Sequence, residues 1–270
     1  MNRTTHDTAK RWLSETRSAV VVEVTQALGS APREAGTRML VSADDAVGTV
    51  GGGHLELKAI AHAREMLRTH DLVPHTEHFP LGPALGQCCG GAVTLSYHAL
   101  DAAALERWPL AQPLFHLQLY GAGHVGRAIA TLLATLDVSV DWIDEREDEF
   151  PVSTNVGTPW PDRIRRVCVD AIEGEVRLAP PGAFYLVLTH DHDLDLRITE
   201  AVLIRADFGY LGLIGSKTKR QRFIHRFEQR GIAPEVIARM TCPIGVEGIA
   251  AKEPELIAIA VVAQLLQRTR

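Results

Sequence analysis

The sequence Gly121-Ala122-Gly123-His124-Val125-Gly126 lies between a predicted strand, residues 115–120, and a predicted helix, residues 125–136. It matches the pattern G-x-G-x-x-G. This pattern is weak evidence for a phosphate-binding loop by itself, but becomes specific when a strand precedes it and a helix follows it. The first glycine permits a tight turn, the second lets the backbone approach a phosphate, and the third lets helix and strand pack closely. Free amides at the helix start then bind an anion. The stretch predicts a Rossmann-type domain that presents its loop to a phosphate-bearing ligand.

The next predicted strand, residues 138–143, ends at Asp144. An acidic residue about 20 positions after the glycine loop usually holds a ribose hydroxyl. Arg146 follows two residues later and is an alternative contact for a phosphate. The predicted binding residues of this half of the chain are Gly121, Gly123, His124, Gly126 and Asp144.

Strands and helices alternate through the rest of the second half. The apolar patterns predict strands at 164–169, 184–189 and 210–214, and helices at 194–204, 217–229 and 254–267. This alternation implies a parallel sheet covered on both faces. We therefore predict an α/β fold with a C-terminal Rossmann-type domain over residues 114–270.

The first half has a different pattern. It predicts helices at 7–17 and 54–70, and strands at 19–27, 37–42, 46–50 and 92–97. Residues 101–113 are rich in alanine and contain Pro109 and Pro113, which is typical of a linker. We expect a smaller α+β domain over residues 1–100 and a linker over 101–113.

Composition restricts the class of protein. The 270 residues are 46% hydrophobic and 23% charged, with a net charge of −5. This is ordinary globular composition without an overall electrostatic signature for nucleic acid or anionic membrane. No apolar stretch approaches the roughly 20 residues needed to cross a bilayer, and the polar residues 1–10 predict no secretory signal. Two adjacent and two distant cysteines do not form a disulfide framework, so we expect a cytoplasmic protein.

The most unusual stretch is Leu81–Gly91, in which Gln87, Cys88 and Cys89 lie among glycines. Thiolates in such a loop are soft ligands for molybdenum, copper or zinc, and are also sulfur acceptors. The alternative is that the thiols are buried as small hydrophobic groups, which is the usual environment of free cysteines. Adjacent cysteines lack the C-x₂₋₄-C spacing of zinc sites. We predict that Cys88 and Cys89 contact a metal.

Three further segments are candidate sites. Backbone amides of Gly52, Gly53 and His54 are placed to hold an anion, or else form only a tight turn before a helix. Ser216 and Lys217 begin a basic helix, with Lys219 and Arg220 following, which favours an anion between the cations over a merely solvated basic face. His190 and His192 suggest a metal site. We treat this hypothesis as secondary because Asp193 is also a good N-cap for the next helix.

Five motifs occur in the same order in a known family. They are Gly51-Gly52-Gly53-His54-Leu55-Glu56, Leu85-Gly86-Gln87-Cys88-Cys89-Gly90-Gly91, Gly121-Ala122-Gly123-His124-Val125, Gly212-Leu213-Ile214-Gly215-Ser216-Lys217 and Pro243-Ile244-Gly245. Over nearly the whole chain the sequence resembles the XdhC/CoxI family, accessory proteins that mature xanthine dehydrogenase and related molybdenum hydroxylases. It departs from the family pattern at Glu247, where no acidic residue is expected.

The resemblance implies a chaperone and not an enzyme. Such a protein binds molybdenum cofactor, supports its sulfuration together with a cysteine desulfurase, and inserts it into apo-xanthine dehydrogenase. A nucleotide is a second candidate ligand of the Rossmann loop, and a homodimer is expected, with neither nucleic acid nor membrane as partner. Two alternatives stay open: an NAD(P)-dependent oxidoreductase, and a redox or metal-sensing module built on the two adjacent cysteines.

Overall fold

The structure, a computed structural model, describes residues 3–81, 91–108, 112–154, 157–249 and 252–269. The chain divides into two compact units, Met1–Gln112 and Pro113–Arg270, which are described separately. The boundary falls at the end of the predicted linker, whose first part forms helix α3 (Ala102–Glu106) of the first unit. Among the described residues, no helix is long and apolar enough to span a membrane.

The first unit is built on a five-stranded antiparallel sheet with the order β3-β2-β1-β5-β4. Its strands are β1 (Ala19–Leu28), β2 (Arg38–Ser42), β3 (Ala46–Gly48), β4 (His75–Pro80) and β5 (Ala92–Ala99). Strand β4 was not predicted from the sequence. It is an edge strand with the sequence HTEHFP and mostly exposed side chains, so it lacks the apolar alternation that identifies a strand.

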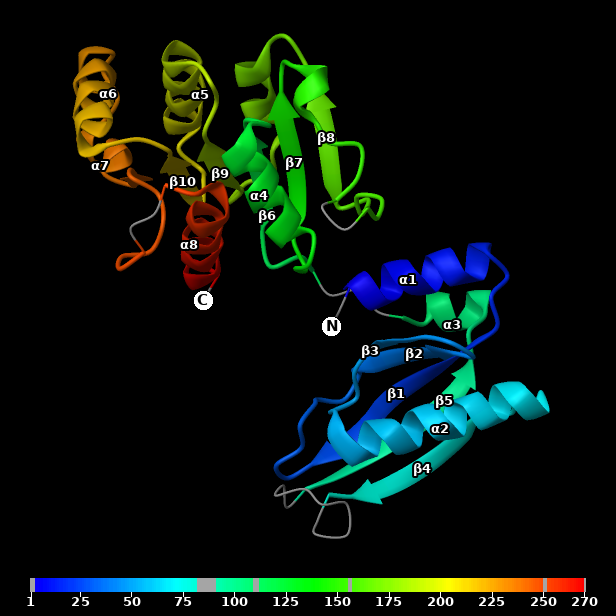
Figure 1. Cartoon of the computed structure of the whole chain (residues 1–270). Helices are drawn as coiled ribbons and strands as arrows, with labels where there is room; N and C mark the ends of the chain where they lie inside the picture. Colours follow the sequence, from blue (N-terminus) through cyan, green and yellow to red (C-terminus); the bar gives the residue numbers. More distant parts are fainter. Residues whose placement is uncertain (1–2, 82–90, 109–111, 155–156, 250–251, 270) are drawn as a thin grey trace. The chain divides into compact units, whose positions relative to one another are not determined.

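Helices cover both faces of this sheet (Figure 1). Because side chains alternate along a strand, Val20 and Val22 of β1 pack toward helix α2 (Gly53–Thr69). Val21 points to the other face, where Trp12 of helix α1 (Arg3–Ser14) and Trp108 complete a second apolar cluster. The unit is therefore a three-layer α/β/α arrangement.

The second unit contains a six-stranded sheet with the order β11-β10-β9-β6-β7-β8, and all neighbouring strands are parallel. The strands are β6 (His116–Tyr120), β7 (Ser139–Asp144), β8 (Ile164–Cys168), β9 (Phe184–Val187), β10 (Tyr210–Leu213) and β11 (Met240–Thr241). Counted within the unit, this is the 3-2-1-4-5-6 order of nucleotide-binding Rossmann domains. It confirms the predicted fold class, an α/β Rossmann-type domain preceded by a smaller domain.

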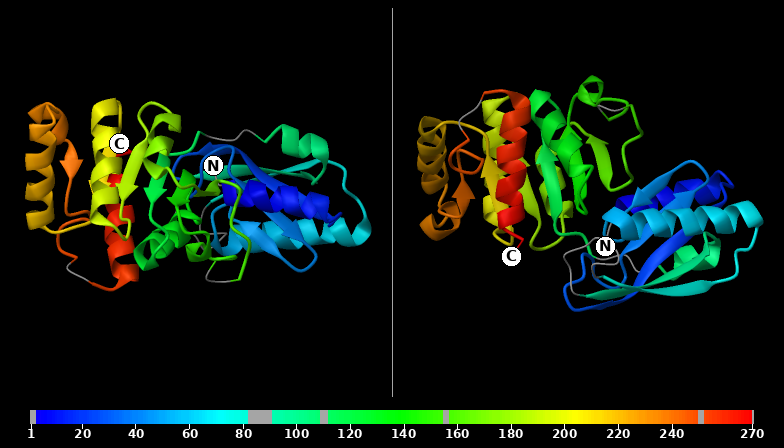
Figure 2. Two further views of the ribbon diagram at one scale, coloured as in Figure 1. Left: turned by 90° about the horizontal axis from the view of Figure 1, so that it is seen from above. Right: turned by 60° about the horizontal axis from the view of Figure 1, so that its bottom comes forward.

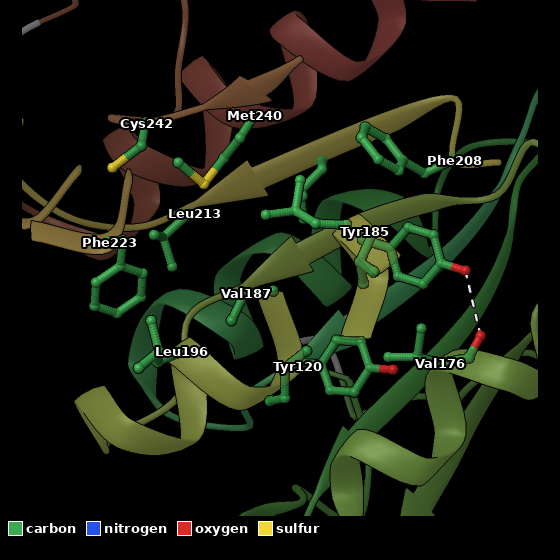
Figure 3. Packing of buried hydrophobic residues seen from close by; sticks show 14 of the residues in the cluster. Tyr120, Val176, Tyr185, Val187, Leu196, Phe208, Leu213, Phe223, Met240 and Cys242 are labelled. Carbon is green, nitrogen blue, oxygen red and sulfur yellow. Dashed lines mark hydrogen bonds between the residues drawn. The ribbon is translucent and has the colours of Figure 1, made fainter. Parts of the chain in front are cut away.

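Two helical layers cover the parallel sheet (Figure 2). Helices α4 (His124–Leu133) and α8 (Pro254–Gln267) pack on one face. The other face carries α5 (His192–Arg205), α6 (Lys217–Gln229), α7 (Pro234–Ile237) and the 3-10 helix η3 (Ile172–Leu178). Figure 3 shows the core beneath this second layer, where Phe223 and Met240 lie with Val187 and Leu213 of the central strands.

Helix α5 begins earlier than predicted. The prediction of Asp193 as its N-cap is wrong, because the Asp191 carboxylate accepts the bond from Leu194 N at 2.7 Å. Helices α6 and α8 span the predicted residues, whereas α4 ends at Leu133, three residues early.

A buried ion pair connects two loops at the carboxyl edge of the parallel sheet. Asp195 Oδ2 accepts from Lys219 Nζ at 2.5 Å, and Asp195 Oδ1 accepts from Thr189 N and Oγ1 at 3.0 and 2.7 Å. The Asp195 and Lys219 side chains are only 0% and 9% exposed. The pair fixes the loop after β9, which contains Thr189, relative to the start of α6.

Replacing one member of this pair leaves the other charge buried. We expect Lys219→Met to lower the free energy of unfolding by about 3 kcal/mol, because a buried carboxylate loses its counter-charge. The double variant Asp195→Leu/Lys219→Met should recover much of this loss. Urea denaturation of both variants checks the prediction, and equal stability of Lys219→Met and the unmodified chain would contradict it.

Candidate functional site

The predicted binding loop lies at the point of the parallel sheet where the strand order reverses. Strands β6 and β9 are neighbours there, and the connections that follow them lead to helices on opposite faces. Ligands of open α/β sheets bind at such a switch point, beyond the carboxyl ends of the strands. A cleft of about 440 Å³ occupies this position, a size typical of small-molecule sites. Its lining residues are Gly123, His124, Val125, Gly126, Arg146, Glu149, Leu188, Thr189, His190 and Ile214.

The three glycines of the motif have different surroundings. A Cβ on Gly121, which has φ of +119°, would lie 2.4 Å from the carbonyl oxygen of Leu188, and a Cβ on Gly126 would lie 2.0 Å from that of Gly121. Both positions therefore exclude a side chain on packing grounds. A Cβ on Gly123 would meet nothing within 4 Å. Only Gly123 faces open space, so its backbone is accessible to a ligand.

Helix α4 starts at this open position. Gly123 is its N-cap and supplies no side-chain hydrogen bond to the first turn. Backbone amides of a first helical turn need acceptors from outside the helix, and the helix dipole favours an acceptor with negative charge. The amides that follow Gly123 line the cleft, so this end of the cleft is suited to a phosphate oxygen.

Asp144 supports the loop from the neighbouring strand. Its Oδ2 accepts from Ala122 N at 2.7 Å and from Arg146 Nη2 at 2.9 Å. Its Oδ1 accepts from Arg146 N and Nε at 3.0 and 2.9 Å. The carboxylate, predicted to contact a ribose, is thus 3% exposed and already bound to four donors.

These donors determine the charge state of Asp144. Burial by itself raises the pKa of the carboxyl, but the hydrogen bonds from Arg146 and from the Ala122 amide outweigh burial and hold the pKa below its ordinary value. The carboxylate is therefore charged at neutral pH and belongs to the structure of the loop.

A set of paired charges adjoins the cleft, and two of its members, Arg146 and Glu149, line it. Glu149 accepts from Arg127 Nη2 at 2.5 Å and from Arg146 Nη1 at 3.4 Å. With Asp144 included, two arginines face two carboxylates and their charges balance. Arg127 and Glu149 were not predicted from the sequence, although the stretch Asp144–Glu149, with five acidic residues around Arg146, is a signal for such a network.

His190 also lines the cleft, and its Nε2 is 3.7 Å from Glu145 Oε1. His192 is instead the first residue of α5. Within the described ranges, no group of three or more His, Cys, Asp or Glu side chains is arranged to hold a metal ion. The described residues therefore offer no support for the secondary metal hypothesis at these two histidines.

The remaining predicted residues are placed as follows. Gly52 N donates to Glu56 Oε2 at 3.1 Å and Val50 N to the same atom at 3.2 Å, so a carboxylate of the chain already fills part of the expected anion cradle before Gly53 and His54. Ser216 is the N-cap of α6, accepting from Lys219 N, and Lys217 is exposed. Gln87, Cys88 and Cys89 lie outside the described residues.

The fold and the cleft define a protein with a Rossmann-type unit, which carries a cleft at its switch point, and an α+β unit. A family model described as the XdhC Rossmann domain matches residues 117–265, and one described as the XdhC and CoxI family matches residues 12–79. The chain therefore belongs to the XdhC and CoxI family, which confirms the resemblance found in the sequence.

Two individual proteins are similar to the chain. The Escherichia coli K12 protein YqeB, named as uncharacterized, is 33% identical over 259 residues, which is 92% of this chain and 43% of YqeB. The chain thus spans less than half the length of this curated relative. A Bacillus halodurans crystal structure described as a xanthine dehydrogenase has a TM-score of 0.72 at 20% identity, covering 98% of this chain and 95% of that one. This second likeness shows the fold alone.

The glycine geometry yields a matched pair of variants. We expect Gly126→Ala to destabilise the second unit by about 2 kcal/mol or more, because overpacking against backbone forces the loop to shift. Gly123→Ala should cost only about 1 kcal/mol, the difference between glycine and alanine at an N-cap. Thermal unfolding of both variants measures the difference, and equal destabilisation would refute the assigned packing.

The Asp144 carboxylate yields a pH prediction. Its folded-state pKa is depressed below 3.8, so its stabilisation is complete above pH 3.8 and is lost as the pH falls through the folded value. We expect Asp144→Asn to lower the free energy of unfolding at pH 7 by about 2 kcal/mol, the scale of bonds to a charged group. The difference from the unmodified chain should shrink below pH 3.8.

Denaturant unfolding across this pH range provides the measurement, and the exposed Asp148→Asn serves as the control. A deficit of Asp144→Asn that stayed constant from pH 7 to acid would show that charge on Asp144 does not stabilise the loop.

Proposed function

We propose that this chain is a maturation factor for xanthine dehydrogenase. It binds molybdenum cofactor, supports sulfuration of that cofactor with a cysteine desulfurase, and passes it to the apo-dehydrogenase. In this role the cofactor is cargo, and the chain is a chaperone and not the catalyst of purine oxidation. Membership of the XdhC and CoxI family and the name of the Bacillus halodurans structure support the choice of recipient.

The observation that carries the proposal is the open position of Gly123 at the switch-point cleft. The pterin of the cofactor ends in a phosphate, and the amides at the start of α4 are suited to donate hydrogen bonds to its oxygens. The Arg127, Arg146, Asp144 and Glu149 side chains neutralise one another. Attraction for the phosphate would therefore come from backbone amides and the helix dipole. Such a site binds an anion without forming a strong ion pair. This suits a ligand that is later transferred to another protein.

Cys88 and Cys89 are proposed to contact the molybdenum. Thiolates are soft ligands that suit this metal and can also receive sulfur, so the same two side chains fit both retention and sulfuration. The desulfurase would supply the sulfur atom, and the chain would hold the cofactor during the exchange. A homodimer is part of the same proposal.

The alternative, an NAD(P)-dependent oxidoreductase, is favoured by the strand order of the second unit. The state of Asp144 argues against it. A ribose diol would have to compete with Arg146 and the Ala122 amide for a carboxylate that is 3% exposed.

Purification from cells that make molybdenum cofactor tests the proposal. We expect the unmodified chain to retain molybdenum and pterin, Cys88→Ala/Cys89→Ala to lose both, and Gly123→Ala to retain about tenfold less pterin because a methyl group would occupy the phosphate position. The readouts are metal analysis and fluorescence of the oxidised pterin. Cys168→Ala, which removes an exposed thiol in the second unit, is the matched control.

Full cofactor retention by the double cysteine variant would remove these thiols from the mechanism. Tight binding of NADH by the unmodified chain, with no pterin retained, would replace the proposal by the oxidoreductase alternative.

A further inference from the structure

Helix α6 carries a concentration of positive charge that the cleft does not use. Its sequence, KTKRQRFIHRFEQ, contains five Lys or Arg residues and one acidic residue. Lys219 is neutralised by Asp195. The other four have no ion-pair partner among the residues that the structure describes. We call these four the α6 basic face: Lys217, Arg222 and Arg226 border the exposed side of the helix, and Arg220 is half-buried on its flank.

This arrangement is unfavourable for the isolated chain. Lys217 and Arg220 lie in the first turn, where cations oppose the helix dipole. Arg222 and Arg226 are four residues apart and both exposed, so they repel each other across one helical turn. The whole chain has a net charge of −5, so the basic face is a local exception to an acidic protein. An anionic partner on this face would relieve both unfavourable terms.

The other side of α6 excludes two classes of partner. Phe223 and Phe227 are 5% and 0% exposed, and both pack in the core of the second unit (Figure 3 shows Phe223). The helix has therefore no free apolar side to insert into a membrane and no exposed Phe, Tyr or Trp ring on which a base could stack.

The exposed positions between the cations are polar. Gln221, His225 and Gln229 are all exposed and can donate hydrogen bonds. Arginines with interspersed hydrogen-bonding side chains are typical of protein interfaces, where a guanidinium binds a carboxylate with two parallel bonds. A carboxylate-rich protein surface complements both the charge and the donors of this face.

We propose that the α6 basic face is a docking surface for an acidic protein partner. Lys217, Arg222, Arg226 and their polar neighbours bind carboxylates of that partner. The docking surface is separate from the cleft, so cargo binding and partner binding use different residues of the second unit. The apo-dehydrogenase serves as the partner in one of the two tests described below, and that test rests on the proposed function.

Binding of the full chain to a fluorescein-labelled polyglutamate peptide, measured by anisotropy at low and physiological salt, tests the surface itself. We expect Arg222→Glu/Arg226→Glu to weaken binding about tenfold or more, and Arg222→Gln/Arg226→Gln to weaken it less. The control Lys10→Glu/Lys58→Glu changes the net charge equally at exposed positions of the first unit and should bind like the unmodified chain. Thermal unfolding verifies that each variant is folded.

Equal weakening by both charge reversals would overturn the proposal. So would tighter binding of duplex DNA or phosphatidylserine vesicles than of the peptide, if that binding also required Arg222 and Arg226.

A second arm uses the purified apo-dehydrogenase. If the unmodified chain binds it and the α6 reversal has no effect, the docking surface is wrong while the maturation role stands. If the chain does not bind it but binds polyglutamate through α6, the maturation role fails while the acidic-partner surface stands.

Discussion

The hydrogen bonding of the Asp144 carboxylate to the glycine loop fixes the shape of the cleft. Asp144 ends β7 and accepts from Ala122 N, while Trp142 of the same strand donates from Nε1 to Gly121 O at 3.0 Å. The second strand of the Rossmann unit therefore fixes the loop that follows the first. With Gly121 and Gly126 packed against backbone, Gly123 and the start of α4 are left facing the cleft.

The same hydrogen bonds also determine which groups of the cleft are available to a ligand. Arg146 forms ion pairs with Asp144 and Glu149, and Arg127 forms an ion pair with Glu149. The charged side chains are thus paired within the protein, and the cleft is lined by the start of α4 together with Thr189 and His190. On the other side of β9, the buried Asp195–Lys219 pair holds the loop that contains Thr189. Two ion-paired supports, one on each side of the switch point, keep the walls of the cleft in place.

Local sequence signals predicted much of this structure. The glycine motif between a strand and a helix predicted the Rossmann unit, and the bounds of α6 and α8 were predicted correctly. Strand β4 was missed because its edge position leaves polar side chains exposed, and β11 because it has only two residues. The position of Asp144 followed from the spacing, but its partners did not. Lys219 was expected near a bound anion, whereas its counter-charge is Asp195, 24 residues earlier in the chain. Contacts of that kind depend on tertiary packing that no local pattern records.

We propose that the Rossmann cleft holds the phosphate of a molybdenum-bearing pterin. A crystal structure of the chain purified from cofactor-producing cells, with molybdenum located by its anomalous scattering, tests it most directly. We predict phosphate oxygens within hydrogen-bond distance of the amides that follow Gly123. A nicotinamide dinucleotide in the cleft, or a cofactor bound away from Gly123, would contradict the claim.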